Sequence, residues 1–311
     1  MNQPASATAT LPWRQAWLAQ ARQHPWSAAG LIAALLVILW LLAHSLLAIA
    51  DGTAARGLRE GLLAGLAGFA ATALGALGGL FLQKLSARAE DSMLGFAAGM
   101  MLAASSFSLI LPGIEAAEGI TGSGVLGALV VLGGLALGVA LMLGMDQFTP
   151  HEHENVGPCG PGSERINRVW LFVMAITLHN LPEGMAMGVS FSQGDLSVGL
   201  PLSSAIAIQD IPEGLAVVMA LRAAGMNTRN AILMAMGSGL MEPLGALLGV
   251  GLASGFALAY PIGLGLAAGA MIFVVSHEVI PETHRNGHQT YATLGLMAGF
   301  GLMMVLDTAL G

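Results

Sequence analysis

Nine apolar segments, each long enough to cross a lipid bilayer, constrain the fold of this chain more than any other feature. A membrane-spanning helix needs about 20 apolar residues. The segments cover residues 27–49, 60–83, 92–113, 122–145, 169–191, 197–221, 230–254, 258–280 and 290–310. The short alternating segments of a transmembrane barrel are absent from the sequence. The sequence therefore predicts an all-α polytopic membrane protein.

The composition excludes several other classes of protein. Only 9% of the residues are charged and 55% are hydrophobic, whereas a soluble domain carries about 25% charged residues. The 43 glycines indicate closely packed helices. A single cysteine excludes a disulfide framework and a cysteine-rich metal site. A net charge of −7 has the wrong sign for nucleic-acid binding. We therefore expect the lipid bilayer as a partner and no nucleic acid. A homodimer is one candidate assembly.

The first apolar segment has two interpretations. Residues 48–50, Ala-Ile-Ala, resemble a signal-peptidase site and favour a cleaved leader. The apolar stretch 26–50 is longer than a usual signal core and follows a long polar lead-in, which favours a retained helix. We predict that residues 1–55 form a cytoplasmic segment with an extra transmembrane helix. Residues 56–311 then form an eight-helix domain with a cytoplasmic loop at 146–168.

The basic residues predict the orientation of the helices. With the N-terminus inside, nine basic residues lie on the inner side and two on the outer side, which is a positive-inside bias. The inner residues are Arg14, Arg22, Lys84, Arg88, Arg165, Arg168, Arg222, Arg229 and Arg285, and the outer ones are Arg56 and Arg59. We therefore expect a multi-pass protein of the inner (plasma) membrane. Its N-terminus is cytoplasmic if the first helix is retained, and its C-terminus lies outside.

Two short matches suggest an internal inverted repeat. Residues 97–99 and 267–269 both read Ala-Ala-Gly, and both segments end in a proline-containing stretch, at 111–115 and 280–283. Because the two helices run in opposite directions, core helices one to three and six to eight would be inverted copies that flank helices four and five. Such repeats are typical of transporters. Chance similarity between Gly/Ala-rich helices is the alternative.

Ionisable residues recur inside two adjacent apolar segments. Residues 178–184 read Leu-His-Asn-Leu-Pro-Glu-Gly, and residues 208–214 read Ile-Gln-Asp-Ile-Pro-Glu-Gly. An ionisable residue in a bilayer costs roughly 2.5–3.5 kcal/mol on insertion scales. His179 and Glu183 are spaced i, i+4 and so share a helix face. The next segment adds Glu242 beside a proline.

A divalent metal is the counter-charge that the sequence favours. The four carboxylates of Glu183, Asp210, Glu213 and Glu242 sum to −4 if ionised, and the central segments contain no lysine or arginine. Two divalent ions would cancel that charge. Imidazole with carboxylate and amide oxygens suits zinc, cadmium, iron or manganese better than copper(I). Protonated carboxyls that only join helices are the alternative.

Residues 178–184 resemble the helix-four signature of the ZIP (Zrt/Irt-like) metal transporter family, and the resemblance covers all eight core helices. It implies a 3+2+3 inverted-repeat bundle that moves divalent metal, typically zinc, into the cytoplasm. The family's transport-site positions match His179, Asn180, Glu183, Gln209, Asp210 and Glu213. Glu242 matches a further ligand of prokaryotic members, and Met101 falls where such members place a ligand. Glu183 and Glu213 would bridge two metals.

The second motif departs from many eukaryotic members of the family. These read His-Glu-x-Pro-His-Glu, whereas this chain has Gln209, Asp210, Glu213 and Gly214. The exchange of imidazole for oxygen ligands makes cadmium transport or broader selectivity plausible. We therefore expect Zn²⁺ as the substrate, with Cd²⁺, Fe²⁺ and Mn²⁺ as further candidates. Met101 is equally well explained by packing, because the chain has 18 methionines.

A second polar cluster is predicted toward the inner helix ends. It comprises His277 and Glu278 with Glu282, and Asp146 at the end of core helix three. His151, His153 and His288 are nearby in sequence or topology. We interpret this cluster as an exit path for metal; a solvated helix end rich in polar groups is the alternative.

An intramembrane metalloenzyme is the competing function. The protease motif His-Glu-x-x-His does not occur in the sequence, and neither does a phosphate-binding loop that would couple ATP. The sequence therefore favours an uptake transporter over an enzyme. By resemblance alone, core helices two, three, six and seven would form a frame against helices one, four, five and eight. The sequence does not distinguish a carrier from a channel.

Overall fold

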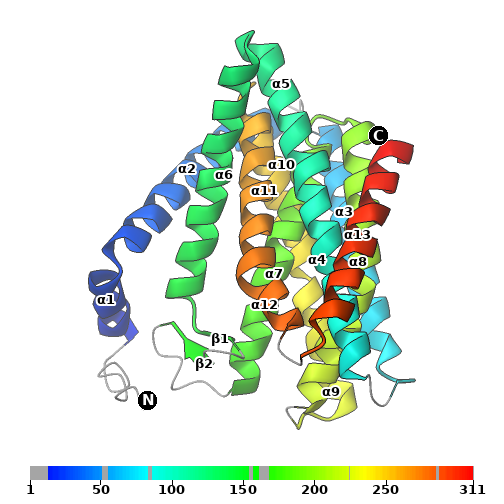
Figure 1. Ribbon diagram of the computed structural model, residues 1–311. Helices are drawn as coiled ribbons and strands as arrows, with labels where there is room; N and C mark the ends of the chain where they lie inside the picture. Colours follow the sequence, from blue (N-terminus) through cyan, green and yellow to red (C-terminus); the bar gives the residue numbers. More distant parts are fainter. Residues whose placement is uncertain are drawn as a thin grey trace.

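Helices make up nearly all of the computed structural model, which describes residues 13–50, 55–82, 86–153, 157–160, 168–223, 225–284 and 287–310 (Figure 1). In chain order they are α1 (Trp13–Gln23), α2 (Pro25–Ala50), α3 (Ala55–Gly78), α4 (Ala87–Ala104), the π-helix η1 (Ser105–Ile110), α5 (Leu111–Thr121), α6 (Gly124–Phe148), α7 (Arg168–Phe191), α8 (Leu196–Ala223), α9 (Thr228–Gly239), α10 (Met241–Ala253), α11 (Ala259–Val274), the π-helix η3 (Val275–Val279), α12 (Ile280–Thr283) and α13 (Gln289–Leu310). All nine predicted apolar segments are helical. The prediction of an all-α polytopic membrane protein is confirmed.

Seven spans within the described residues are long and apolar enough to cross a membrane. They are α3, the continuous α4–η1–α5, α6, α8, α9 with α10, α11–η3–α12, and α13. Helix α7, with 24 residues, packs among them and completes the eight-helix core. The extra N-terminal helix α2 precedes this core, and α1 bends away from α2 by 110°.

Two local features differ from the sequence-based expectations. The predicted loop 146–168 contains a short antiparallel hairpin of β1 (His151–His153) and β2 (Gly157–Cys159), and α6 continues to Phe148. The predicted span 92–113 continues through Pro112 to Thr121. Pro112 occupies the first turn of α5, where its missing N–H is tolerated. A proline there does not end the span.

Closely spaced glycines join the helices of the core. The most extensive pairings are α4 with α13, α6 with α11, α7 with α10, and α3 with α8. In three of these pairs, glycines spaced four apart on each helix lie against the partner's main-chain carbonyl oxygens, where a Cβ atom would come within 1.9–2.6 Å. These glycines are Gly95 and Gly99 with Gly295 and Gly299, Gly134 and Gly138 with Gly265 and Gly269, and Gly184 and Gly188 with Gly245 and Gly249. Small residues at this spacing let helix backbones approach closely in lipid.

The same contacts recur in two oppositely directed halves. In Figure 1, α4–η1–α5 rises toward the top of the molecule, and α11–η3–α12 descends. Gly95 and Gly99 on α4 correspond to Gly265 and Gly269 on α11, and each pair is followed by a π-helix and a proline-containing helix. The first pair packs on α13, which is core helix eight, and the second pair packs on α6, which is core helix three. The predicted 3+2+3 inverted-repeat bundle is confirmed.

The helix pairing corrects the expected division of the core. Core helix six (α9 and α10) packs mainly on α7 and α3, and core helix eight (α13) packs mainly on α4. Core helices one, four, five and six therefore form the first group, which consists of α3, α7, α8 and α9–α10. Core helices two, three, seven and eight form the second group, which consists of α4–η1–α5, α6, α11–η3–α12 and α13. In each group, glycines of one helix lie against main-chain carbonyl oxygens of its neighbour, which allows these pairs to pack closely.

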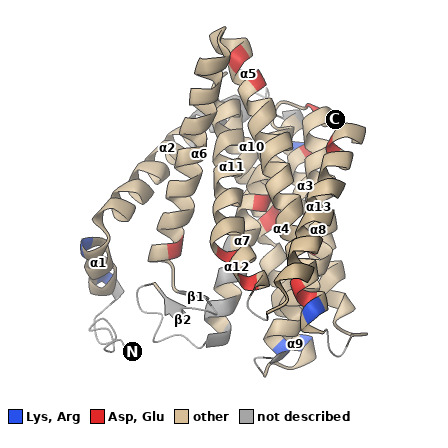
Figure 2. Cartoon of the chain, in the orientation of Figure 1, with Lys and Arg blue, Asp and Glu red and all other residues tan. Residues whose placement is uncertain are grey.

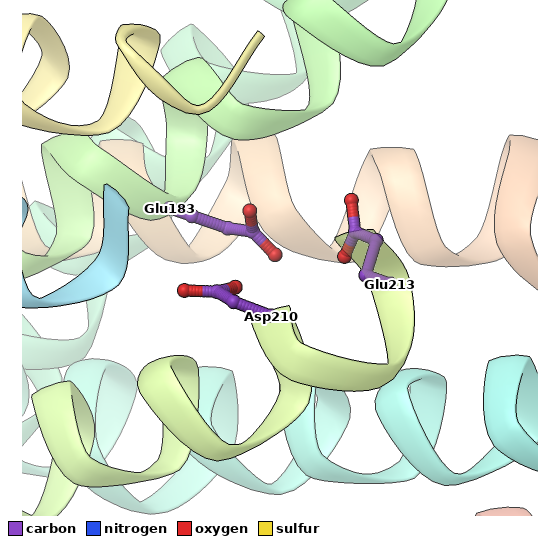
Figure 3. A group of neighbouring side chains, drawn as sticks. All are labelled: Glu183, Asp210 and Glu213. Carbon is purple, nitrogen blue, oxygen red and sulfur yellow. The ribbon is translucent and has the colours of Figure 1, made fainter. Parts of the chain in front are cut away.

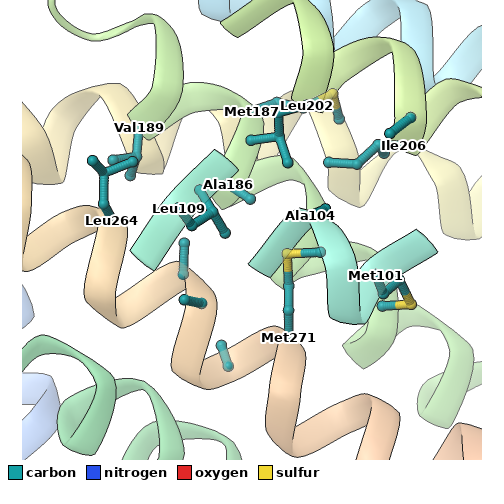
Figure 4. Close-up of a cluster of buried hydrophobic side chains, with 14 of the residues drawn as sticks. Met101, Ala104, Leu109, Ala186, Met187, Val189, Leu202, Ile206, Leu264 and Met271 are labelled. Carbon is teal, nitrogen blue, oxygen red and sulfur yellow. The ribbon is translucent and has the colours of Figure 1, made fainter. Parts of the chain in front are cut away.

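A buried apolar cluster lies where the two groups meet. It includes Met101 and Ala104 on α4, Ala186 and Met187 on α7, Leu202 and Ile206 on α8, and Leu264 and Met271 on α11 (Figure 4). Such side chains supply non-directional contact without polar partners. The polar site described below is therefore embedded in the first group, beside an apolar seam.

The glycine contacts predict a difference between two positions on one helix. We expect Gly138→Ala to lower the melting temperature of the purified protein, because the new Cβ would lie 2.1 Å from the Leu266 carbonyl oxygen. Overpacking of this kind costs about 1–3 kcal/mol. Gly133→Ala, also on α6, meets no atom within 4 Å and should be neutral or stabilising. Thermal unfolding in detergent measures both variants; equal losses would contradict the packing argument.

Candidate metal-binding site

Three carboxylates converge at the centre of the first helix group. Glu183 comes from α7, and Asp210 and Glu213 come from α8. One oxygen of each lies within 4.8 Å of the others, and the three side chains point toward a common space (Figure 3). Glu183 and Asp210 are each 1% exposed, and Glu213 is half-buried. The two motifs found in the sequence are thus brought together, as expected for ionisable residues that need a common counter-charge.

Three further buried polar residues, on α7, α8 and α10, accompany this cluster. The Gln209 Nε2 donates a hydrogen bond to Glu183 Oε1 at 2.5 Å. Glu242, in the first turn of α10, is fully buried and accepts a hydrogen bond from Thr72 Oγ1 at 2.6 Å. Asn180 on α7 is also buried. Three transmembrane helices therefore supply oxygen-bearing side chains, and a fourth, α3, donates a hydrogen bond to one of them.

Several buried oxygens at this site accept no hydrogen bond from an amide, hydroxyl or imidazole of the described residues. They are Glu183 Oε2, Gln209 Oε1, Asp210 Oδ2 and Glu242 Oε2. An uncompensated buried charge costs several kcal/mol, and adjacent carboxylates also repel one another. The central segments contain no lysine or arginine. Oxygen atoms presented without donors match the ligand preference of divalent cations.

His179 links this cluster to the predicted second one. Its Nε2 forms a short hydrogen bond with Glu278 Oε2. The sequence predicts two separate clusters, whereas the structure joins them, because Glu278 of the second cluster lies against His179 of the first. Glu278 belongs to η3, and a π-helical turn holds an extra residue relative to an α-helix. This shifts the directions of the side chains from those that a regular helical period predicts.

The other members of the predicted second cluster divide between two places. The His277 Nε2 lies 3.9 Å from Asp146 Oδ2 at the end of α6, and the His277 ring stacks on Phe273. His288 instead pairs with the buried Asp91 of α4, with Nδ1 and Oδ2 2.9 Å apart. The side chains of His151 and His153 lie outside the described part of the structure. The exit role of Asp146, His277 and Glu278 stays a prediction.

Met101 and Thr72 lie at the edge of the predicted ligand set. Met101 is 2% exposed and belongs to the apolar cluster between the helix groups (Figure 4). Its role as a metal ligand stays a prediction. Thr72, by contrast, touches Glu242 although the motifs in the sequence do not include it. Alignment of the two inverted halves could have found it, because Thr72 and Glu242 occupy corresponding positions.

Comparison with known proteins gives a consistent result. The profile of the ZIP zinc transporter family matches residues 151–307. Zinc transporter ZIPB of Bordetella bronchiseptica is 65% identical over the full length of both chains. Zinc transporter GufA of Myxococcus xanthus is 44% identical, covering 81% of this chain and 99% of its own. Human zinc transporter ZIP11 is 31% identical, covering 72% of this chain and 89% of its own. The chain belongs to the ZIP zinc transporter family.

Proposed function

We propose that this protein takes up zinc into the cytoplasm, without ATP, through the buried site formed by Glu183, Asp210, Glu213 and their neighbours. The observation that carries the proposal is the set of buried oxygens that lack hydrogen-bond donors in a membrane-embedded bundle. A divalent ion satisfies such oxygens and cancels their charge. The relatives named as zinc transporters support zinc as the ion that is moved. Those names give no support to the metalloenzyme alternative, and the protein is a transporter, not an enzyme.

The ligand set supports two ions held side by side. His179, Gln209, Glu183 and Glu213 would hold one ion, and Asn180, Asp210 and Glu242 would hold the other with Glu183 and Glu213 as bridges. Met101 is a further candidate ligand. Oxygen atoms dominate this set, so cadmium, iron and manganese are candidate substrates as well as zinc. Two divalent ions would balance the formal charge of the four carboxylates.

A path toward the cytoplasm is proposed from the polar contacts below the site. Glu278 touches His179, and the neighbouring His277 lies near Asp146 at the end of α6. Most of the described basic residues lie at this same end of the molecule (Figure 2). By the positive-inside rule, that end faces the cytoplasm of the plasma membrane. In this orientation the N-terminal segment 1–55, with α2 retained, begins inside and the C-terminus lies outside.

Uptake by purified protein in liposomes tests the proposed function. We expect zinc entry down its concentration gradient in the absence of ATP, followed with a zinc-sensitive dye trapped in the lumen. Competition by cadmium, iron and manganese would rank the substrates. Protein-free liposomes control for leakage. Zinc entry that does not exceed this leakage, from vesicles with correctly folded protein, would refute the proposal.

A further inference from the structure

Thr72 makes a specific contact with the carboxylate that closes the site from α10. Its side chain is 5% exposed, and its Oγ1 donates to Glu242 Oε1 at 2.6 Å. The other oxygen, Glu242 Oε2, accepts no hydrogen bond from an amide, hydroxyl or imidazole of the described residues. Glu242 lies beside Glu183, because the neighbouring Gly184 packs directly on the Glu242 main chain. One oxygen of Glu242 is therefore held by a hydroxyl, and the other is left for a ligand.

The backbone of α3 leaves room for this arrangement. Gly68 lies one helical turn before Thr72, and a Cβ atom at position 68 would lie 1.9 Å from Glu242 Oε2. Any side chain there would displace the carboxylate. Gly239 also approaches the Thr72 side chain, with its Cβ position 3.1 Å from Thr72 Cβ. The carboxylate of Glu242 is thus confined between a glycine and a hydroxyl of the same helix.

The inverted repeat explains why these two residues meet. Gly214 of α8 packs on the Thr72 carbonyl oxygen, and Gly184 of α7 packs on the Glu242 carbonyl oxygen. Thr72 and Glu242 are 170 residues apart, and the same shift relates Gly95 and Gly99 to Gly265 and Gly269. They are therefore counterparts in the two halves. The halves differ here in chemistry: one supplies a carboxylate, and the other supplies its hydrogen-bond donor.

We propose that Thr72 is a positioning residue for the second metal ion. It fixes the Glu242 carboxylate so that Oε2 faces the ion, although Thr72 itself does not touch the metal. This inference rests on the proposed function, and it adds a residue on a fourth helix to the determinants of metal affinity. Glutamate has three rotatable side-chain bonds, and the hydroxyl removes part of their freedom before the ion arrives.

Zinc titration of purified protein by calorimetry tests the inference. Thr72→Val keeps the branched shape and removes the hydroxyl, whereas Thr72→Ser keeps the hydroxyl. We expect Thr72→Val to bind the first zinc ion as the wild type does and the second about tenfold more weakly, as for the loss of one hydrogen bond to a charged group. Thr72→Ser should restore most of the affinity for the second ion. Melting temperatures establish that both variants are folded.

Gly68→Ala offers an independent route to the same carboxylate. Its Cβ would displace Glu242 Oε2 while the Thr72 hydroxyl stays in place. We expect this substitution to weaken the binding of the second zinc ion at least as much as Thr72→Val does. Wild-type affinity for the second ion in both Thr72→Val and Gly68→Ala would overturn the inference and leave the proposed function intact. Equal weakening in Thr72→Val and Thr72→Ser would also overturn it, because packing would then explain the effect. Wild-type protein that binds no zinc would overturn the proposed function itself.

Discussion

Glu183→Ala should abolish most zinc uptake while the protein still inserts into the membrane and folds. Glu183 lies in the carboxylate group with Asp210 and Glu213, and its side chain is 1% exposed. In the proposed site it contacts both ions, so its removal deprives each ion of a ligand. No other carboxylate is placed to contact both ions from α7.

The same substitution should leave the metal-free protein as stable as the wild type, or more stable. In the absence of metal, Glu183 is a buried carboxylate beside other carboxylates, and one of its oxygens has no hydrogen-bond partner among the described residues. Its replacement by a small apolar residue removes both the desolvation cost and the repulsion, which together offset the loss of the hydrogen bond from Gln209. A residue needed only for packing would instead lose stability together with activity.

Uptake into liposomes and thermal unfolding without metal, measured on the same preparation, separate these outcomes. Glu115→Ala, which removes an exposed carboxylate of α5, is the matched control and should transport normally. His179→Ala should also lose uptake, since it removes the imidazole ligand. Undiminished flux in both Glu183→Ala and His179→Ala would refute the assignment of the site.

The helices and the central site follow from the sequence for identifiable reasons. Apolar length predicts each span, and the i, i+4 spacing of His179 and Glu183 puts both side chains on one face of α7. The repeated motif then requires α7 and α8 to face each other, because two sets of ionisable residues need a common partner. These are local or nearly local properties of the chain, so periodicity and charge are sufficient to predict them.

The remaining parts depend on which helices become neighbours. The glycines are visible in the sequence, but nothing local says that Gly95 meets Ala292 and not another helix. The division of the core helices expected from resemblance alone therefore differs from the observed one, in which α10 packs on α7. The π-helices escape a search based on regular period, which is why the contact between Glu278 and His179 was not anticipated. Thr72 has no ionisable group, so only its structural equivalence to Glu242 reveals it.

Glu242→Ala should lower the number of zinc ions bound per protein from two toward one. Glu242 reaches the cluster from α10. Gly184 and Gly188 of α7 let the two helices approach closely, because a Cβ at either position would lie within 2.2 Å of a carbonyl oxygen of α10. In the proposed arrangement it contacts the second ion alone. The ligands of the first ion, His179 and Gln209 among them, remain in the variant.

Charge balance leads to the same expectation. The four carboxylates carry −4 if ionised, which two divalent ions neutralise, whereas three carboxylates leave the second ion with an uncompensated positive charge in a low-dielectric interior. Metal analysis after equilibrium dialysis against buffered zinc measures the stoichiometry, with Glu242→Gln as a control that keeps the shape and removes only the charge. Both variants should retain one tightly bound ion. Two ions bound to Glu242→Ala, or a single ion bound to the wild type, would show that this carboxylate does not complete a second metal site.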